Sequence, residues 1–346
     1  MKRIYKYIFL VITIVLIISK PVRAQEITHI QKDINLIFVL DSSYSMNVNN
    51  KNKIAEEIIY MFVDNLPSKD TKIGYVAYND SITTFLKPTT IKKHEERVNI
   101  KNRIKSIRKT GYSDMGLGMK KGFELVREDL KENSQPIMIL ISDGETSLSR
   151  NSNRTETHSE LDMEEIVKKA NGINMPIYTI SLDKNHYILE GISRKTKGKM
   201  YDNPSSGDLI NIFKEISENY STSTVKPFIE IKGTGKKQDI SISVKESYRD
   251  ESNILVISSE PIREANIIGE KKDFHFSKSK YYFSVKIVGN KEGELLLNFI
   301  TRKNAKVKVY KLSNYNANLI LHVPDKIYKN KSFKIDAYFN MKMTSF

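Results

Sequence analysis

The fold of this 346-residue chain is decided by the stretch Ile34-Asn35-Leu36-Ile37-Phe38-Val39-Leu40-Asp41-Ser42-Ser43-Tyr44-Ser45. Its first seven residues form a nearly continuous apolar run, which is typical of a parallel strand buried on both faces. A second such run, Pro136–Ile141, also ends in a polar cluster, Ser142-Asp143-Gly144. Because ligands bind beyond the carboxyl ends of strands in open α/β sheets, we expect both clusters at one edge of the sheet.

Segments with helical spacing of apolar residues separate the strand-like runs from Asp33 to about Tyr220. The segment from Ile54 to Leu66, for example, repeats apolar residues every three or four positions and is closed by Pro67. This alternation predicts an α/β fold with a doubly wound, mostly parallel sheet. We place this domain at residues 34–222.

The pattern changes after Thr224, where short strand-like runs follow one another with no helical period between them. Tyr281–Val288 alternates between an apolar face and a more polar one. These features predict an antiparallel, sandwich-like all-β domain at residues 225–312. Residues 313–346 form a β-rich C-terminal extension, which either adds to this sandwich or begins a further, truncated domain.

The first 24 residues have the order of a secretory signal peptide: basic residues, an apolar run from Tyr7 to Ile18, and Ala24 at a suitable cleavage position. Residues 25–33 then form a linker. The apolar run is shorter than the roughly 20 residues of a spanning helix, so a retained N-terminal membrane anchor is the alternative. We expect a secreted or cell-surface protein. The chain has no cysteine, which excludes disulfides and thiolate metal sites and fits a bacterial surface.

The net charge of +15 is unevenly distributed. Residues 25–222 hold 28 basic and 28 acidic residues, whereas residues 223–346 hold 23 basic and 13 acidic ones. Such a basic region favours anionic cell-wall polymers or a membrane surface as partners, and a lysine-rich solvated surface is the alternative. The basic residues are scattered, with no aromatic-interleaved stripe, which argues against nucleic acid.

A third polar cluster, Gly111-Tyr112-Ser113-Asp114-Met115-Gly116, precedes a segment with helical spacing. Together the three clusters supply three hydroxyls and two carboxylates from three loops. Oxygen ligands with few charges suit Mg²⁺, which keeps several waters and requires octahedral geometry. The pattern therefore favours a metal-dependent binding protein over an enzyme. The candidate metal ligands are Asp41, Ser43, Ser45, Ser113 and Asp143.

These motifs resemble the von Willebrand factor A domain, also called the integrin I-type domain, over roughly residues 34–220. That family's metal-ion-dependent adhesion site has an Asp-x-Ser-x-Ser loop, a later Thr, and an Asp after the central strand. The first loop is intact as Asp41-x-Ser43-x-Ser45, and Asp143 follows the second buried run. Ser113 departs from the pattern because it stands where the family usually has Thr. It supplies the same hydroxyl without the methyl group that helps to fix the rotamer.

The resemblance implies a role for each residue around Mg²⁺, with Mn²⁺ or Ca²⁺ as alternatives. Ser43 and Ser45 would bind the metal directly, and Ser113 directly or through water. Asp41 and Asp143 would act largely through coordinated waters and by orienting the serines. The cation would then accept an Asp or Glu carboxylate from a protein partner. The implied function is an exported or cell-surface adhesion protein, and not an enzyme.

Two alternatives remain open at this point. One is an exported hydrolase, because the third cluster almost matches the Gly-x-Ser-x-Gly nucleophile elbow, although Met115 replaces the second glycine. The six histidines are dispersed, and none lies beside a motif. The other alternative is a structural surface protein whose metal site has decayed or only staples loops.

Overall fold

The computed structural model describes the chain in segments separated by gaps. The described residues are 22–23, 33–144, 146–183, 187–220, 223–245, 249–268, 274–288, 292–315, 317–322, 326–327 and 336–341. Apart from Val22–Arg23 and Asp33, the predicted signal peptide and linker lie outside them. The chain divides into two compact units, Lys32–Tyr315 and a second made of Met1–Gln31 and Asn316–Phe346. Among the described helices, none has the length and apolar character needed to span a bilayer.

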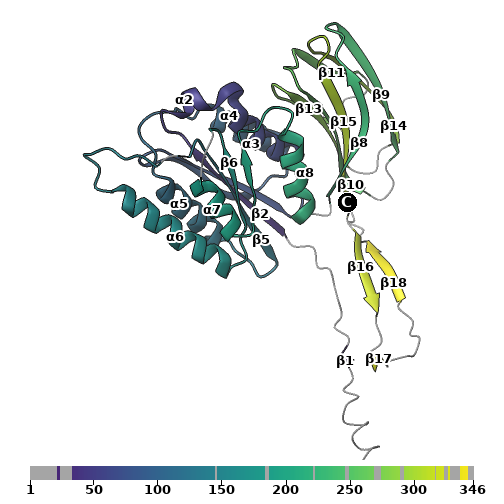
Figure 1. Cartoon of the computed structure of the whole chain (residues 1–346). Coiled ribbons are helices and arrows are strands. Elements are labelled where there is room, and N and C mark those ends of the chain that lie inside the picture. Colours follow the sequence, from purple (N-terminus) through teal and green to yellow (C-terminus); the bar gives the residue numbers. More distant parts are fainter. Residues whose placement is uncertain are drawn as a thin grey trace, which may run out of the picture. The chain divides into compact units, whose positions relative to one another are not determined.

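The first part of the larger unit is built on a six-stranded sheet (Figure 1). All neighbouring strands in this sheet are parallel except for the antiparallel edge strand β4. The predicted doubly wound, mostly parallel fold is therefore confirmed. In spatial order the strands are β4 (Ile82–Thr90), β3 (Thr71–Tyr78), β2 (Asp33–Asp41), β5 (Ser134–Ser142), β6 (Ile177–Ser181) and β7 (Met200–Asp202).

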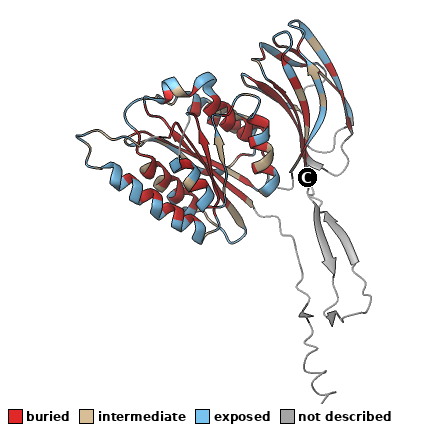
Figure 2. Ribbon diagram, in the orientation of Figure 1, coloured by how far each residue is buried: buried red, intermediate tan, exposed pale blue. Residues whose placement is uncertain are grey.

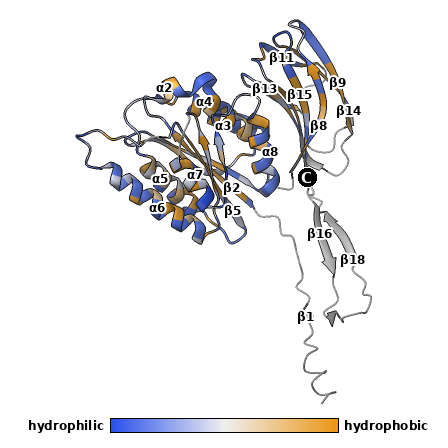
Figure 3. Cartoon of the chain, in the orientation of Figure 1, coloured by the Kyte–Doolittle hydropathy of each residue, from blue (hydrophilic) through white to orange (hydrophobic). Residues whose placement is uncertain are grey.

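Helices cover both faces of this sheet because its central strands are apolar on both sides (Figure 3). In β2, Phe38 and Leu40 pack with the helices of one layer, and Ile37 and Val39 pack with those of the other. The first layer holds α3 (Ile54–Asn65), α4 (His94–Lys105) and α8 (Leu209–Tyr220). The second holds α5 (Met115–Glu128), α6 (Glu156–Gly172) and α7 (Tyr187–Lys195). Two short elements, α2 (Met46–Asn49) and the 3₁₀ turn η1 (Lys51–Lys53), connect β2 to α3.

The second part of the larger unit consists of two antiparallel sheets, as the sequence predicted. Their facing sides share one apolar core (Figure 2). The five-stranded sheet has the order β12 (Phe274–Lys278), β13 (Tyr282–Val288), β10 (Arg249–Ser258), β15 (Lys306–Tyr315) and β8 (Ser223–Lys232). The three-stranded sheet has the order β11 (Glu264–Ile268), β14 (Glu292–Ile300) and β9 (Lys237–Lys245).

Both faces of β13 are buried, although only one of them is apolar. Phe283, Val285 and Ile287 belong to the core between the two β sheets. On the opposite face, the hydroxyl of Tyr282 donates to Asp64 Oδ2 at 2.7 Å, and Lys286 Nζ donates to the carbonyl of Leu66 at 3.1 Å. The alternation therefore identified the two faces correctly, but the more polar one packs against α3 and the residues after it instead of facing solvent.

The α/β part and the β part share a second core as well as these polar contacts. Phe62 of α3 and Phe213 of α8 belong to the same buried cluster as Leu255, Tyr282 and Leu312 of the five-stranded sheet. The larger unit is therefore held together by apolar packing across the boundary between its two parts.

The smaller unit contains two short antiparallel pairs in its described residues. Strand β16 (Ala317–His322) pairs with β18 (Asp336–Met341), and β1 (Val22–Arg23) pairs with β17 (Lys326–Ile327).

Candidate metal centre

The candidate site lies where the sheet changes its winding direction. Strands β2 and β5 are adjacent and parallel, and Asp41 and Ser142 are their last residues. The chain continues from β2 to its neighbour β3 on one side, and from β5 to β6 on the other. This is the topological switch point at which open α/β sheets bind their ligands.

The first loop brings two serine hydroxyls together just beyond β2. The backbone N–H of Ser43 donates to Asp41 Oδ1 at 2.8 Å, which closes a tight turn after the strand. The Oγ atoms of Ser43 and Ser45 then lie 3.0 Å apart. Ser43 is buried and Ser45 is exposed, so the loop runs from the buried end of β2 to the surface. Helix α2 begins at the next residue, Met46.

The second carboxylate oxygen of Asp41 collects hydroxyl donors from the other two loops. Ser113 Oγ donates to Asp41 Oδ2 at 2.9 Å, and Ser142 Oγ donates to the same oxygen at 2.8 Å. The Tyr78 hydroxyl lies 3.5 Å from it. Asp41 is therefore the point at which loops from three places in the chain converge.

Burial makes the charge of Asp41 costly unless a cation balances it. Asp41 has no exposed surface, and this burial raises its pKa, to which the nearby charge of Asp143 adds. Hydrogen bonds from Ser43 and Ser142 act in the opposite direction. A divalent cation beside the two carboxylates would offset their repulsion and favour the ionised form of Asp41.

Asp143 is held at the same edge by α2. Asn49 Nδ2 donates to Asp143 Oδ2 at 3.1 Å, which ties the end of the first loop to the cluster Ser142-Asp143-Gly144. The next residue, Gly144, has a φ of 102° and donates its N–H to Ser142 Oγ at 2.9 Å. A side chain at that positive φ would be strained, which accounts for glycine in this turn.

The loop that carries Ser113 is fixed by backbone contacts on both sides. Ser113 forms an antiparallel bridge with Ser147, and the two N–H···O distances are 2.8 and 2.9 Å. Tyr44 N–H donates to the carbonyl of Gly111 at 3.1 Å, where Gly111 has a φ of 73°. The first and second loops are therefore joined directly, on the side of the loop that carries the Ser113 hydroxyl to Asp41.

The residues after Ser113 are anchored by an ion-pair network. Asp114 is buried, caps helix α5 by accepting the N–H of Leu117, and pairs with Arg154. Arg154 in turn pairs with Asp162 of α6, and Lys120 pairs with the same aspartate. This network holds the start of α5 against α6, and its residue Asp114 directly follows Ser113 in the chain.

The donor set fits a small, hard dication. Two adjacent ligands of octahedral Mg²⁺ with bonds of about 2.0–2.1 Å lie about 2.9 Å apart, close to the separation of the Ser43 and Ser45 hydroxyls.

Thr146, next to the Ser147 bridge residue, has a buried Oγ1 with no hydrogen-bond partner among the described residues. Those residues contain no group of three or more His, Cys, Asp or Glu that could hold a metal. The candidate set of three serines and two aspartates offers only oxygen donors, which favours a hard cation.

Several residues at this site had no role assigned from the sequence. Ser142 belongs to the cluster Ser142-Asp143-Gly144, and its position at the end of a strand was the available signal. Tyr78 ends β3 next to Asp41, with which it pairs in the sheet. Asn49 gave no signal, because its contact with Asp143 spans 94 positions along the chain.

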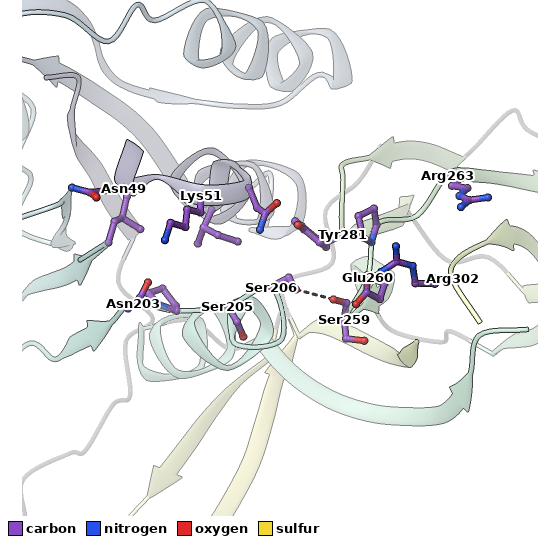
Figure 4. A pocket seen from close by; sticks show the side chains of 15 residues that line it. Asn49, Lys51, Asn203, Ser205, Ser206, Ser259, Glu260, Arg263, Tyr281 and Arg302 are labelled. Atoms are coloured by element: carbon purple, nitrogen blue, oxygen red, sulfur yellow. Dashed lines mark hydrogen bonds and ion pairs between the residues drawn. The ribbon is translucent and has the colours of Figure 1, made fainter. Parts of the chain in front are cut away.

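A cavity of about 600 Å³ borders the site on the side of Asn49 (Figure 4). Lys51 and Asn203 lie at the same end as Asn49, and Arg263 and Arg302 lie at the other end. The lining of the cavity is mostly polar and carries more basic than acidic side chains.

Comparison with known proteins assigns the chain to a family. No curated protein matches the chain. A von Willebrand factor type A protein from Catenulispora acidiphila is 11% identical, with 84% of this chain and 62% of that one covered and a TM-score of 0.44. The pilus adhesin SpaC from Lactobacillus rhamnosus GG is 11% identical, with 92% and 50% covered and a TM-score of 0.43. The PilB minor pilin from Streptococcus sanguinis is 11% identical, with 58% and 64% covered and a TM-score of 0.41.

The chain spans between half and two thirds of the length of these three proteins. The family model for the von Willebrand factor type A domain matches residues 35–215, which hold all five candidate ligands. The chain therefore belongs to the von Willebrand factor type A domain family.

Proposed function

We propose that this chain is a non-enzymatic binding protein, secreted or displayed at a cell surface, that recognises a carboxylate of a protein partner through Mg²⁺. Mn²⁺ and Ca²⁺ are alternative cations. The observation that carries the proposal is the convergence of three polar loops on the buried carboxylate of Asp41, with the Oγ atoms of Ser43 and Ser45 3.0 Å apart on the first of these loops.

In this proposal each residue has a distinct task. Ser43, Ser45 and Ser113 offer neutral hydroxyl oxygens, while Asp41 and Asp143 orient them and bind coordinated waters. A cation held mainly by neutral oxygens keeps most of its positive charge and can attract a carboxylate from outside. Asp41 is suited to the orienting task because its two oxygens already accept from Ser43 N–H and from the Ser113 hydroxyl.

The hydrolase alternative has less support. The hydroxyl of Ser113 donates to Asp41 and has no imidazole partner in the described part of the chain. Gly116, which stands one position beyond the second glycine of a nucleophile elbow, donates its N–H to Ser159 Oγ at 2.8 Å and packs against α6. A nucleophile elbow is a sharp turn from a strand into a helix. The cluster precedes a helix but does not follow a strand.

The proposed location rests on the N-terminal sequence, which has the order of a signal peptide. A second partner, an anionic cell-wall polymer or membrane surface, is proposed for the basic residues after Ser223. Lys286 does not belong to that set, because it is buried and paired with Glu251.

Metal titration of the full chain tests the central proposal. We expect calorimetry to show one saturable site for Mg²⁺, and thermal unfolding to shift upward with Mg²⁺ because a ligand that binds only the folded state stabilises it. Ser45→Ala should weaken Mg²⁺ binding at least about tenfold, since it removes an exposed ligand without disturbing the fold. Ser42→Ala is the matched control, because the Ser42 hydroxyl donates to the carbonyl of Tyr78 and not toward the site.

Three outcomes would contradict the metal site or its proposed use. A folded chain that binds none of Mg²⁺, Mn²⁺ and Ca²⁺ would show that the hydroxyl cluster is not a metal site. Metal binding that survives Ser45→Ala and Asp41→Ala unchanged would place the cation elsewhere. Binding of the metal without any response to added carboxylate ligands would leave the cation a structural staple of the three loops.

A further inference from the structure

We propose that Tyr44, Val48 and Tyr112 form an apolar collar around the metal site, which selects partners whose carboxylate is flanked by apolar side chains. The inference rests on the proposed function, because the collar has a use only if the cation accepts a carboxylate. It goes further in naming the surface that distinguishes one acidic partner from another.

The three side chains stand next to the candidate ligands in the chain. Tyr44 lies between Ser43 and Ser45, Tyr112 directly precedes Ser113, and Val48 is in α2, three residues after Ser45. Their exposed fractions are 68% for Tyr44, 65% for Val48 and 47% for Tyr112. Large apolar side chains usually bury much more of their surface, so three of them around a polar site indicate a contact surface.

The backbones that carry the two tyrosines are held together. Asn47 Nδ2 donates to the carbonyls of Tyr44 and Lys109, at 3.0 Å in each case. Tyr44 N–H donates to Gly111, the residue before Tyr112, and Thr110 N–H donates to the carbonyl of Ser42. The two rings therefore project from one fixed double loop, and little backbone freedom is lost when a partner covers them.

The chemistry of the collar specifies its occupant. A partner segment that presents Asp or Glu to the cation must place the neighbouring side chains over Tyr44, Val48 and Tyr112. Apolar neighbours would bury this surface, whereas glycine or charged neighbours would leave it exposed to water. Burial also excludes water from around the carboxylate and the cation, which strengthens their attraction. The occupant is thus a protein segment with an acidic side chain between aliphatic or aromatic ones.

Three synthetic tripeptides, each acetylated and amidated, test this on the full chain with saturating Mg²⁺. Leu-Asp-Leu has both features, Gly-Asp-Gly has the carboxylate alone, and Leu-Asn-Leu has the apolar side chains alone. Dissociation constants would be measured by NMR titration for the wild type, for Tyr44→Ala and Tyr112→Ala, and for Leu161→Ala. Leu161 is a matched control, since it is 59% exposed on the outer face of α6. Mg²⁺ saturation is verified by titration for each variant.

We expect Leu-Asp-Leu to bind the wild type about tenfold more tightly than Gly-Asp-Gly, from partial burial of two leucines. Each tyrosine variant should lower this ratio severalfold, and Leu161→Ala should leave it unchanged. Equal affinity for the two Asp peptides, or a ratio that survives both tyrosine variants, would overturn the collar while leaving the metal-held carboxylate intact. Equal binding of Leu-Asn-Leu and Leu-Asp-Leu, or no peptide binding to the Mg²⁺-loaded chain, would overturn carboxylate recognition itself, and the collar with it.

Discussion

Arg154 Nε lies 2.6 Å from Oδ2 of Asp114, the residue that directly follows the candidate ligand Ser113. Asp114 has no exposed surface, whereas the Arg154 side chain is 29% exposed. The guanidinium thus neutralises a buried carboxylate at the start of α5 from outside, and it also reaches Asp162 on α6 at 2.7 Å. The position of the Ser113 loop depends on this bridge between two helices.

Arg154→Ala should lower the free energy of unfolding by about 2 kcal/mol, because it leaves the buried Asp114 carboxylate without its main counter-charge. It should also weaken Mg²⁺ binding severalfold, since the Ser113 loop loses its anchor. Denaturant titration and calorimetry measure the two effects. Lys169→Ala, which removes an exposed pair with Glu165 within α6, should change stability by less than about 0.5 kcal/mol. Equal effects of the two substitutions would contradict the role given to Arg154.

Gly116 is required by the close approach of α5 and α6. A Cβ at this position would lie 2.1 Å from the backbone oxygen of Ser159, so the two helices would have to separate. We expect Gly116→Ala to lower the free energy of unfolding by about 2–3 kcal/mol. At Gly191 in α7 an added Cβ meets nothing within 4 Å, and Gly191→Ala should raise stability by about 0.5–1 kcal/mol. Urea unfolding of the two variants measures both changes in the free energy of unfolding. A Gly116→Ala protein as stable as the wild type would refute the packing argument.

Tyr282→Phe tests whether the polar contacts across the larger unit stabilise it. The substitution removes the 2.7 Å hydrogen bond to the buried Asp64 carboxylate while keeping the ring in place. We expect a loss of about 1–2 kcal/mol in the free energy of unfolding, as for a buried hydrogen bond to a charged group. Tyr310→Phe serves as a comparison within the same sheet, and it should change stability by less than about 0.5 kcal/mol. The interpretation fails if both variants unfold at the same denaturant concentration as the wild type.

The buried ammonium of Lys286 predicts a pH dependence of stability. Burial, together with the charge of Arg97, lowers the pKa of Lys286 to about 8, against the attraction of Glu251 and Asp64. The folded chain then releases this proton near pH 8, while the unfolded chain holds it to about pH 10.4. Because the unfolded state binds more protons in between, stability from this group rises with pH between about 8 and 10.

Lys286→Met should therefore flatten this part of the pH–stability curve, measured by urea unfolding at intervals from pH 7 to pH 10. Lys308→Met provides the control, since Lys308 is an exposed lysine of β15 paired loosely with Glu230 at 3.7 Å. Its removal should leave the slope as in the wild type. A slope that persists without Lys286 would show that other groups produce it.

The elements that could be predicted from the sequence are those whose pattern is local. The apolar runs Ile34–Leu40 and Pro136–Ile141 predicted β2 and β5 to within two residues, because a strand buried on both faces needs no partner information to be recognised. Strands β11 and β12 were not predicted. Each has only five residues, of which two are buried in β11 and one in β12, so neither contains an apolar run or an alternation long enough to be recognised.

The residues of the candidate site also divide into those that a local sequence pattern predicts and those that it does not. Asp41, Ser43 and Ser45 are close in sequence, so their proximity follows from one turn after one strand. Asn49 and Arg154 became apparent only in three dimensions, because their partners lie 94 and 40 positions away. Contacts of this kind depend on where α2 and the segment before α6 come to rest, which no local pattern encodes.

The buried second face of β13 has a mechanical consequence. Glu57 of α3 accepts the hydroxyl of Ser279 at 2.8 Å, and Asp64 of the same helix accepts that of Tyr282, so the helix is attached along its length to the five-stranded sheet. Helix α3 also follows the candidate metal loop through α2 and η1. Under the proposed function, tension on a captured partner would pass from Ser45 through α3 into the sheet by way of packed side chains, and the peptide connection after Tyr220 would be spared most of the load.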